Sequence, residues 1–281
     1  MRRPYLRDLK PAKLGLFVSA LLVAWLYLEG PASLTSLPRI QEADAAIAFD
    51  NNSSAAASGA QNTLTWSHTT NAGSDRILVV GVSIRYSASQ TVGTVTYNLV
   101  GLTKVGAFNS AAVRVELWQL VAPPTGTYNV VVTLAASATA RMAAGAVSLT
   151  GVDQTTPIDA KDFTATATSA TPSVTVTTVA NNAWVIDVLG FRQEGFGVGF
   201  PTGTPTGTGQ VERWSGYMTP NDTASMRSKG STVGPKSPAG GVTMSWSLLA
   251  SGGGPASVQW AHYGASLKPS AAAATTTIGN G

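Results

Sequence analysis

From residue 46 onward the chain alternates apolar and polar residues with a period of two, or runs briefly through β-branched residues between turn formers. Both patterns are typical of β-strands, and no stretch keeps the 3.6-residue period of a helix. The predicted strands are residues 46–49, 63–69, 77–86, 93–99, 102–108, 113–121, 128–135 and 142–149, then 173–178, 183–191, 209–215, 225–230, 242–249 and 258–267. The pattern therefore predicts an all-β fold, an antiparallel β-sandwich of jelly-roll type.

The two series of predicted strands resemble each other. Four phrases recur in the same order: 64–66 leading to 76–81 with 174–176 leading to 183–188, 115–118 with 211–214, 128–134 with 241–248, and 144–149 with 263–267. We therefore predict two similar halves, about residues 61–152 and 171–268, within a folded body of residues 46–269. Tandem sandwiches and two halves of one sandwich both fit. We favour one unit, because Ile158 and Phe163 in the joining segment 150–170 would be wasted on a solvated tether.

The first 45 residues have the layout of an export signal. Five basic residues among the first thirteen precede the apolar run 14–28, which is short of the roughly 20 residues that a membrane-spanning helix needs. Ala43 and Ala45 are the small residues of a cleavage site, so we predict a signal peptide cut after Ala45, with an uncleaved anchor as the alternative. Both place the rest of the chain in secreted or cell-surface form. The Ala/Thr/Gly-rich tail, residues 270–281, is predicted to be disordered.

Charge and cysteine content exclude several functions. The net charge is +4, but only twelve basic and ten acidic residues remain after residue 45, too even a balance for a nucleic-acid partner. The chain has no cysteine, hence neither disulfides nor a thiolate metal site. His68 and His262 are far apart in sequence, and each is expected to be a hydrogen-bonded structural residue. No cofactor and no metal are predicted.

Several phrases carry a resemblance to a known kind of module. They are IAFDN at 47–51, LTWSHT at 64–69, RILVVGVSIR at 76–85, PPTGTYNVVVTL at 123–134 and GAVSLTGVDQTTPIDA at 145–160. Together they resemble a β-sandwich module common in secreted bacterial proteins, and the resemblance covers most of residues 46–268. Such modules occur beside lectin-like and carbohydrate-binding domains in large surface proteins and have no established activity. The resemblance thus implies a fold and a location, and by association the binding of sugars or surfaces.

One strand carries a candidate binding surface. Alternation in 113–121 would place Arg114, Glu116 and Trp118 on one face, opposite the strand's aliphatic side chains, and Glu212 with Trp214 repeats part of this stripe. A ring beside a carboxylate suits sugar recognition, because the ring stacks on the pyranose while the acid accepts hydroxyl protons. The stripe would then face solvent and is a candidate ligand-binding surface. The interpretation we favour for these residues is that the tryptophans cover a sheet edge and Glu116 pairs with Arg114.

The favoured function is a non-catalytic binding module whose partner is a polysaccharide or cell-surface glycan. One alternative is a self-associating subunit of a surface layer or filament, in which segment 46–49 adds to the sheet edge of a neighbour. A second is a glycan-active hydrolase with Glu116 and Glu212 as its carboxylate pair. Membrane contact is expected only through residues 14–28, if these are not removed.

Three aspartates in the joining segment are candidate metal ligands. Asp153, Asp159 and Asp162 could hold calcium together with nearby carbonyls, but their spacing is not that of an EF-hand loop. Capping of turns by their carboxylates is the favoured interpretation.

Overall fold

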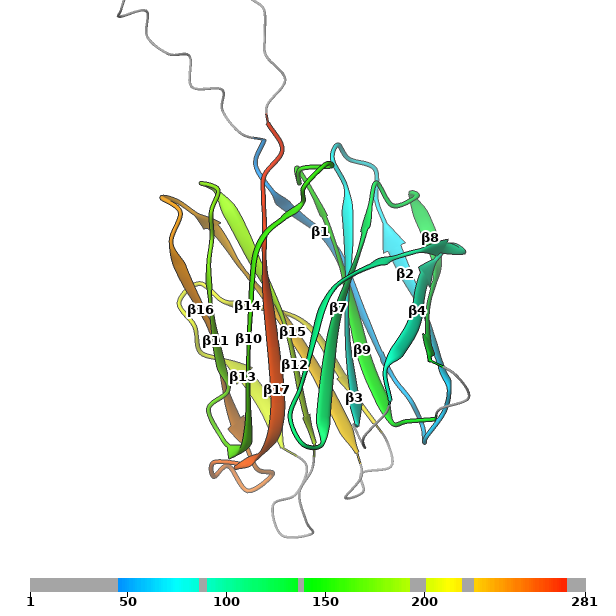
Figure 1. Ribbon diagram of the computed structural model, residues 1–281, viewed down its shortest axis with the longest axis vertical. Coiled ribbons are helices and arrows are strands. Elements are labelled where there is room, and N and C mark those ends of the chain that lie inside the picture. Colours follow the sequence, from blue (N-terminus) through cyan, green and yellow to red (C-terminus); the bar gives the residue numbers. More distant parts are fainter. Residues whose placement is uncertain (1–44, 86–89, 136–138, 193–200, 219–224, 272–281) are drawn as a thin grey trace, which may run out of the picture. The chain divides into compact units, whose positions relative to one another are not determined.

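A computed structural model of the chain (Figure 1) describes residues 45–85, 90–135, 139–192, 201–218 and 225–271. These residues form antiparallel β-sheets and no helix, so the all-β prediction is confirmed. In the described ranges there is accordingly no helix of the length and hydropathy needed to cross a membrane. The predicted signal or anchor lies outside the described residues, except for Ala45. The described part of Glu42–Gly281 is one compact unit.

The first half of the chain builds two sheets. The larger, which we call the first inner sheet, has the strand order β1-β9-β3-β7-β6. Its strands are β1 (Ala48–Ala56), β9 (Met142–Thr150), β3 (Ile77–Arg85), β7 (Val113–Val121) and β6 (Thr103–Asn109). The smaller, the first outer sheet, has the order β2-β8-β4-β5. Its strands are β2 (Thr63–Thr70), β8 (Gly126–Leu134), β4 (Val92–Tyr97) and β5 (Val100–Gly101).

The second half repeats this arrangement. The second inner sheet has the order β10-β17-β12-β15-β14, and the second outer sheet has the order β11-β16-β13. The inner strands are β10 (Ile158–Ser169), β17 (Val258–Leu267), β12 (Ala183–Arg192), β15 (Met226–Lys236) and β14 (Val211–Tyr217). The outer strands are β11 (Ser173–Thr177), β16 (Gly241–Leu249) and β13 (Thr202–Pro205).

The four sheets are stacked as layers, with the two inner sheets face to face in the middle (Figure 1). Contacts across each junction define this order. Val92 of the first outer sheet donates its backbone N–H to Glu116 of the first inner sheet. Ser83 and Ser228 join the two inner sheets through their hydroxyls at 3.0 Å. Trp246 of the second outer sheet donates to Asp187 of the second inner sheet at 2.8 Å. Each half thus supplies two packed sheets.

Strand order shows which repeated phrases are truly equivalent. Three of the four matches join strands in the same position of their sheets, β2 and β3 with β11 and β12, β8 with β16, and β9 with β17. The match of 115–118 with 211–214 is wrong. β7 lies next to β3, whereas the strand in that position of the second half is β15, and β14 is an edge strand equivalent to β6. The two Val-Glu-x-Trp phrases therefore lie on strands that are not equivalent.

The joining segment is itself a strand. β10 occupies residues that were expected to join the halves, and it pairs along β17 from Ile158 opposite Leu267. It corresponds to β1, which pairs along β9. Asp50 on β1 accepts the backbone N–H of Asn71 at 3.0 Å, and Asp159 on β10 accepts that of Ala180 at 2.8 Å. The equivalent aspartates cap equivalent turns, so the duplication also includes these edge strands.

Both ends of the folded body are tied down. The N–H of Ala45 donates to the carbonyl of Ser270 at 2.8 Å, and the Ser270 hydroxyl donates to Asp75 at 2.8 Å. The disordered tail was predicted to begin at residue 270, but Ser270 is buried and belongs to the folded body. Residues 272–281 lie outside the described part. Segment 46–49 was the candidate for adding to the sheet edge of a neighbour. In the structure its residues Ala48 and Phe49 already pair within the chain, opposite Thr150 and Leu149.

Candidate functional site

The predicted Arg114–Glu116–Trp118 stripe does not face solvent. Glu116 is 0% exposed and Trp118 is 6% exposed, so this expectation is wrong. The reason is that β7 belongs to a sheet covered on both sides. The N–H of Val92 approaches Glu116 from the first outer sheet, while Val115 lies against Gly190 of the second inner sheet. Alternation along a strand cannot reveal that its polar face is covered as well.

Glu116 instead anchors a buried ionic cluster. Its carboxylate accepts Arg114 Nε at 2.7 Å and the N–H of Val92 at 3.0 Å, and pairs with Lys104 Nζ at 2.8 Å. The Lys104 ammonium also lies 4.8 Å from the centre of the Trp118 ring. The favoured interpretation, in which Glu116 pairs with Arg114, is therefore the observed geometry. A carboxylate held in this way positions strands and is not open to a ligand.

Trp214 and Glu212 lie in the other half of the chain. Trp214 is 3% exposed and fills the junction between the two inner sheets, where Nε1 donates to Ser228 at 3.3 Å. Glu212 pairs with Lys229 at 2.9 Å. Glu116 and Glu212 thus belong to different sheets and each is engaged by its own lysine. The structure does not bring them together as the carboxylate pair that a hydrolase would need.

His68 belongs to a chain of hydrogen bonds inside the first half. Trp66 Nε1 donates to Ser53 Oγ at 3.0 Å, and Ser53 Oγ is 2.8 Å from His68 Nδ1. His68 Nε2 is 3.2 Å from Ser148 Oγ, which donates to Asp50 at 2.6 Å. Since the Ser148 proton points to Asp50, His68 donates from Nε2 and accepts at Nδ1. This is the neutral tautomer, and burial lowers the pKa of His68 to about 4 although Asp50 acts to raise it.

The second half has its own buried polar centre at Asp187. The carboxylate accepts the N–H and the hydroxyl of Ser231 at 2.6 and 2.7 Å, and Trp246 Nε1 and His262 Nε2 both at 2.8 Å. Asp187 and His262 are completely buried. Four donors satisfy the charge, so the cluster stabilises the packing of β12, β15, β16 and β17. Both histidines are hydrogen-bonded residues of the interior, as expected.

The three aspartates of the joining segment do not form a cluster. Asp153 accepts the N–H groups of Thr155 and Thr156, both at 2.8 Å, and pairs with Lys268 at 2.8 Å. The hydrogen bond from Lys268 is the largest cause that lowers the pKa of Asp153 to about 2. Asp159 caps the turn at Ala180, and Asp162 accepts the N–H of Phe163 at 2.7 Å. Turn capping is thus confirmed for Asp153 and Asp159, whereas Asp162 lies within β10 and accepts from the next residue of that strand. No group of metal-ligating side chains occurs within the described ranges.

An open groove follows the seam where β6 of the first half lies beside β10 of the second. We call it the seam groove; it measures about 320 Å³ and is lined by Lys104, Val105, Gln119, Ile158, Asp159, Ala160 and Lys161. Lys161 spans the seam and donates to the carbonyl of Val105 at 3.0 Å. Gln119 Oε1 and Asp159 Oδ1 are buried oxygens with no hydrogen-bond partner among the described residues. Because both atoms are shielded from solvent, they lie beneath the surface of the groove.

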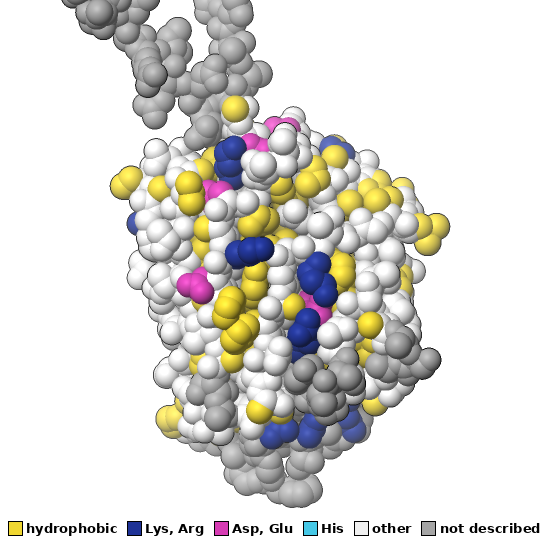
Figure 2. All heavy atoms as spheres, in the orientation of Figure 1, with side chains coloured by type: hydrophobic (Ala, Val, Ile, Leu, Met, Phe, Trp, Pro, Cys, Tyr) yellow, Lys and Arg dark blue, Asp and Glu magenta, His cyan; other side chains and the backbone are white. Residues whose placement is uncertain are grey.

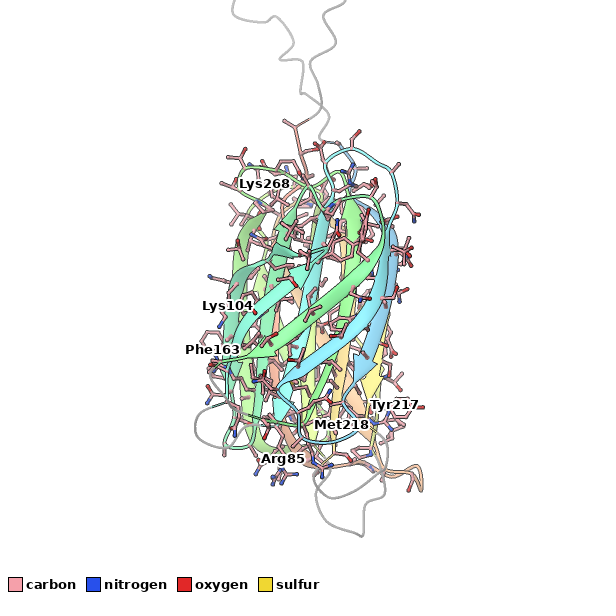
Figure 3. The ribbon with its side chains drawn as sticks, turned by 90° about the vertical axis from the view of Figure 1, so that its right-hand side faces the viewer. Arg85, Lys104, Phe163, Tyr217, Met218 and Lys268 are labelled. Carbon is pink, nitrogen blue, oxygen red and sulfur yellow. The ribbon has the colours of Figure 1, made fainter. Side chains whose placement is uncertain are left out.

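Aromatic rings continue the seam beyond Lys161. Phe163 is 48% exposed and stacks on Phe108 with ring centres 4.0 Å apart and planes 25° apart. Tyr263 lies nearly parallel to Phe163 at 6.3 Å, and burial raises its pKa. Figure 3 shows Lys104 and Phe163 projecting at the same side of the molecule. In Figure 2 a band of apolar side chains runs down the middle of this face between basic ones. The seam therefore presents a ring next to a polar groove.

Sequence reasoning missed this site because the seam joins distant parts of the chain. Phe163 and Ile158 gave the only signal, being apolar residues in a segment expected to be a connection. Had that segment been assigned as an edge strand, Lys161 and Phe163 would have fallen on one face of it. Their partners on β6 could not have been inferred, since nothing local pairs β6 with β10.

In comparisons with known proteins, no family model, no curated protein and no solved structure matches this chain.

Proposed function

We propose that the chain is a non-catalytic secreted or cell-surface module that binds a glycan at the seam groove, with Phe163 as the ring on which a sugar packs. The observation that carries the proposal is the half-exposed Phe163 on β10, the strand that also supplies Ile158, Asp159, Ala160 and Lys161 to the lining of the groove. An exposed ring held by stacking on Phe108 is already ordered, so little side-chain entropy is lost when a ligand binds.

The chemistry of the groove suits a pyranose. A sugar ring has an apolar face of C–H groups, which packs on an aromatic ring, and a rim of hydroxyls that both donate and accept. Lys104 and Lys161, which line the groove, would donate to sugar oxygens. Lys104 and Arg114, held on Glu116, leave the groove weakly basic.

We further propose that each half is a jelly-roll-like sandwich of the kind found in secreted bacterial proteins, so that the fold provides a rigid scaffold. The phrases that resemble this module, such as 76–85 and 123–134, support the assignment. A secreted module also agrees with the predicted export signal, whose basic and apolar residues precede residue 30.

The test is a glycan array probed with the secreted protein and with Phe163→Ala. Loss of the ring should weaken binding by about 1–3 kcal/mol, roughly 5- to 150-fold, because stacking and water exclusion are lost. Tyr217→Ala is the matched control, since Tyr217 is equally exposed at 53% but lies on β14, away from the groove. Equal array profiles for wild type and Phe163→Ala would exclude the seam groove as the glycan site.

A further inference from the structure

The strands of the two outer sheets contain no Asp, Glu, Lys or Arg. The strands of the inner sheets contain many, including Lys104, Glu116, Lys161 and Lys229. Solvent-facing strand positions usually include charged residues. The outward-facing positions of these strands therefore carry no charged side chain.

Hydroxyl groups dominate both faces. The side chains that point outward from the first outer sheet are Thr63, Thr65, Ser67, Thr69, Thr94, Thr96, Thr127, Asn129, Val131 and Thr133. Those that point outward from the second are Ser173, Thr175, Thr177, Thr202, Thr204, Thr243, Ser245, Ser247 and Leu249. We call these two sets the hydroxyl faces. They arose at equivalent places in the two halves.

Neighbouring strands order these hydroxyls. Thr69 and Thr127 share a hydrogen bond of 2.7 Å across β2 and β8, and Thr175 and Thr243 share one of 2.9 Å across β11 and β16. In each pair one hydroxyl donates its proton to the other. The second hydroxyl keeps its own proton free to donate, and both oxygens keep lone pairs that can accept. The faces therefore offer rows of groups that both donate and accept, spaced by about 4.8 Å between strands and about 6.8 Å along them.

A groove lies on each hydroxyl face, along equivalent strands. The first, about 380 Å³, is lined by Asn98, Leu99, Thr127, Tyr128, Asn129 and Val131. The second, about 500 Å³, includes Thr206, Thr208, Thr243 and Ser245, and its only charged side chain is Lys236, at the end of β15. Along β8 and β16 both grooves are thus lined by uncharged residues.

We infer that the two hydroxyl faces bind an uncharged polysaccharide, and that one molecule bridges two polymer chains or surfaces. A ligand with fixed charges would find no counter-charge on these strands, whereas a neutral polymer offers hydroxyls that donate and accept in the same way. Each contact is weak, so an extended ligand that makes many of them is required. The inference uses residues distinct from the seam groove and shares with the proposed function only the class of ligand.

Bridging follows from the order of the layers. The two outer sheets flank the two inner ones, so their outward faces cannot touch the same stretch of a rigid polymer (Figure 1). Two weak sites on one compact body would hold two chains together and gain retention by multivalency. The duplication thereby has a use that a single half would not provide.

The test mixes the whole secreted protein with suspensions of swollen cellulose, chitin and insoluble β-1,3-glucan, and measures retention and flocculation. Asn129→Asp places a charge in the first groove and Thr243→Glu in the second. Each single variant should stop flocculation while reducing retention only several-fold, and the double variant should reduce retention at least tenfold. Ser58→Glu with Thr155→Glu, exposed turn positions, is the control with the same added charge.

Three results would overturn the inference: retention of the double variant equal to that of wild type, no retention of wild type on any of the three polymers, or a wild-type oligomer in polymer-free sedimentation that the same variants dissociate. The last would assign the faces to a second copy of the chain. Phe163→Ala separates the two proposals. If Phe163→Ala loses binding on the array but still flocculates polymer, both the seam groove and the hydroxyl faces are supported. If Phe163→Ala changes neither, the seam groove alone is excluded as a glycan site.

Discussion

The indole of Trp214 occupies the space that a side chain at Gly145 would need, since a Cβ at Gly145 would lie 2.0 Å from Trp214 Cγ. Where β6 packs against β17, a Cβ at Gly106 would likewise lie 2.0 Å from the Tyr263 hydroxyl. Strand register makes Gly106 equivalent to Trp214 and Gly145 equivalent to Tyr263. The two halves have thus exchanged ring and glycine, so that a ring of the second half meets a glycine of the first half in both contacts.

This exchange makes the halves complementary to each other and not to themselves. Two first halves would place Gly106 against Gly145 and leave a void, whereas two second halves would set Trp214 against Tyr263 and clash. Voids and overpacking both destabilise an interface. The geometry therefore specifies pairing between unlike halves.

Gly145→Ala should destabilise the protein by about 3 kcal/mol, because the added methyl meets the rigid centre of the indole and not a flexible tip. Thermal or denaturant unfolding measures this. Gly101→Ala is the control, as a Cβ there would meet nothing within 4 Å, and its effect should stay within about 0.5 kcal/mol.

Trp214→Ala should cost about 3–5 kcal/mol, the usual loss for a buried aromatic ring. In that background Gly145→Ala should become nearly neutral, since the methyl then enters the vacated space. Additive losses in the double variant would mean that the two residues do not compete for one volume.

A second exchange concerns charge. Glu116 on β7 and Lys229 on β15 are equivalent in register, and so are their partners Lys104 and Glu212. The two halves thus hold the same ion pair with opposite polarity. Glu116→Lys should destabilise by about 3 kcal/mol, because a buried cation would face Lys104 and Arg114.

Lys104→Glu combined with Glu116→Lys reproduces the polarity of the second half. We expect it to recover part of the stability lost in Glu116→Lys, though not all of it, since Arg114 remains beside position 116. Equal unfolding midpoints for the single and double variants would show that the pair contributes nothing.

The sequence was sufficient for the class of fold and for most strands, because period-two alternation is a local signal. It also indicated the duplication through phrases such as 144–149 and 263–267. It failed at β7, where alternation distinguishes two faces but cannot tell that both are covered. Trp118 on β7 and Trp214 on the edge strand β14 are both interior residues, so the solvent-facing stripe is wrong.

The candidate site could not be predicted for a different reason. The seam groove and both ring-glycine contacts are made between halves, and their members, such as Gly106 and Tyr263, are far apart in sequence. No periodicity in one strand encodes which sheet will face it. The hydroxyl faces, by contrast, were visible in the sequence as Thr-x-Thr alternation, but their lack of charge becomes informative only once the sheets are known.

His68 should make the protein less stable in mild acid. Burial lowers its pKa from 6.5 to about 4, so between these values the unfolded state binds more protons. Stability is thus full above about pH 6.5 and declines as the pH falls towards 4, by up to about 3 kcal/mol at this site. Protonation at Nδ1 would also set two donors against each other at Ser53. The denaturation midpoint should follow this slope, and His68→Gln should flatten it. An unchanged slope in His68→Gln would assign the effect to other groups.

Separated halves should depend on each other. Residues 45–155, expressed alone, would expose the inner-sheet face that holds Gly81, Gly106 and Gly145, and residues 156–271 would expose Trp214 and Tyr263. Faces of this size and apolarity drive aggregation, so we expect each half alone to be aggregated or to lack a sharp thermal transition. Co-expressed, the halves should form a soluble 1:1 complex, because each ring finds its glycine. Introducing Gly145→Ala into the first half should weaken that complex, whereas Gly101→Ala should not. A first half that is soluble alone and unfolds in a sharp transition of its own would show that the inner sheets do not need each other.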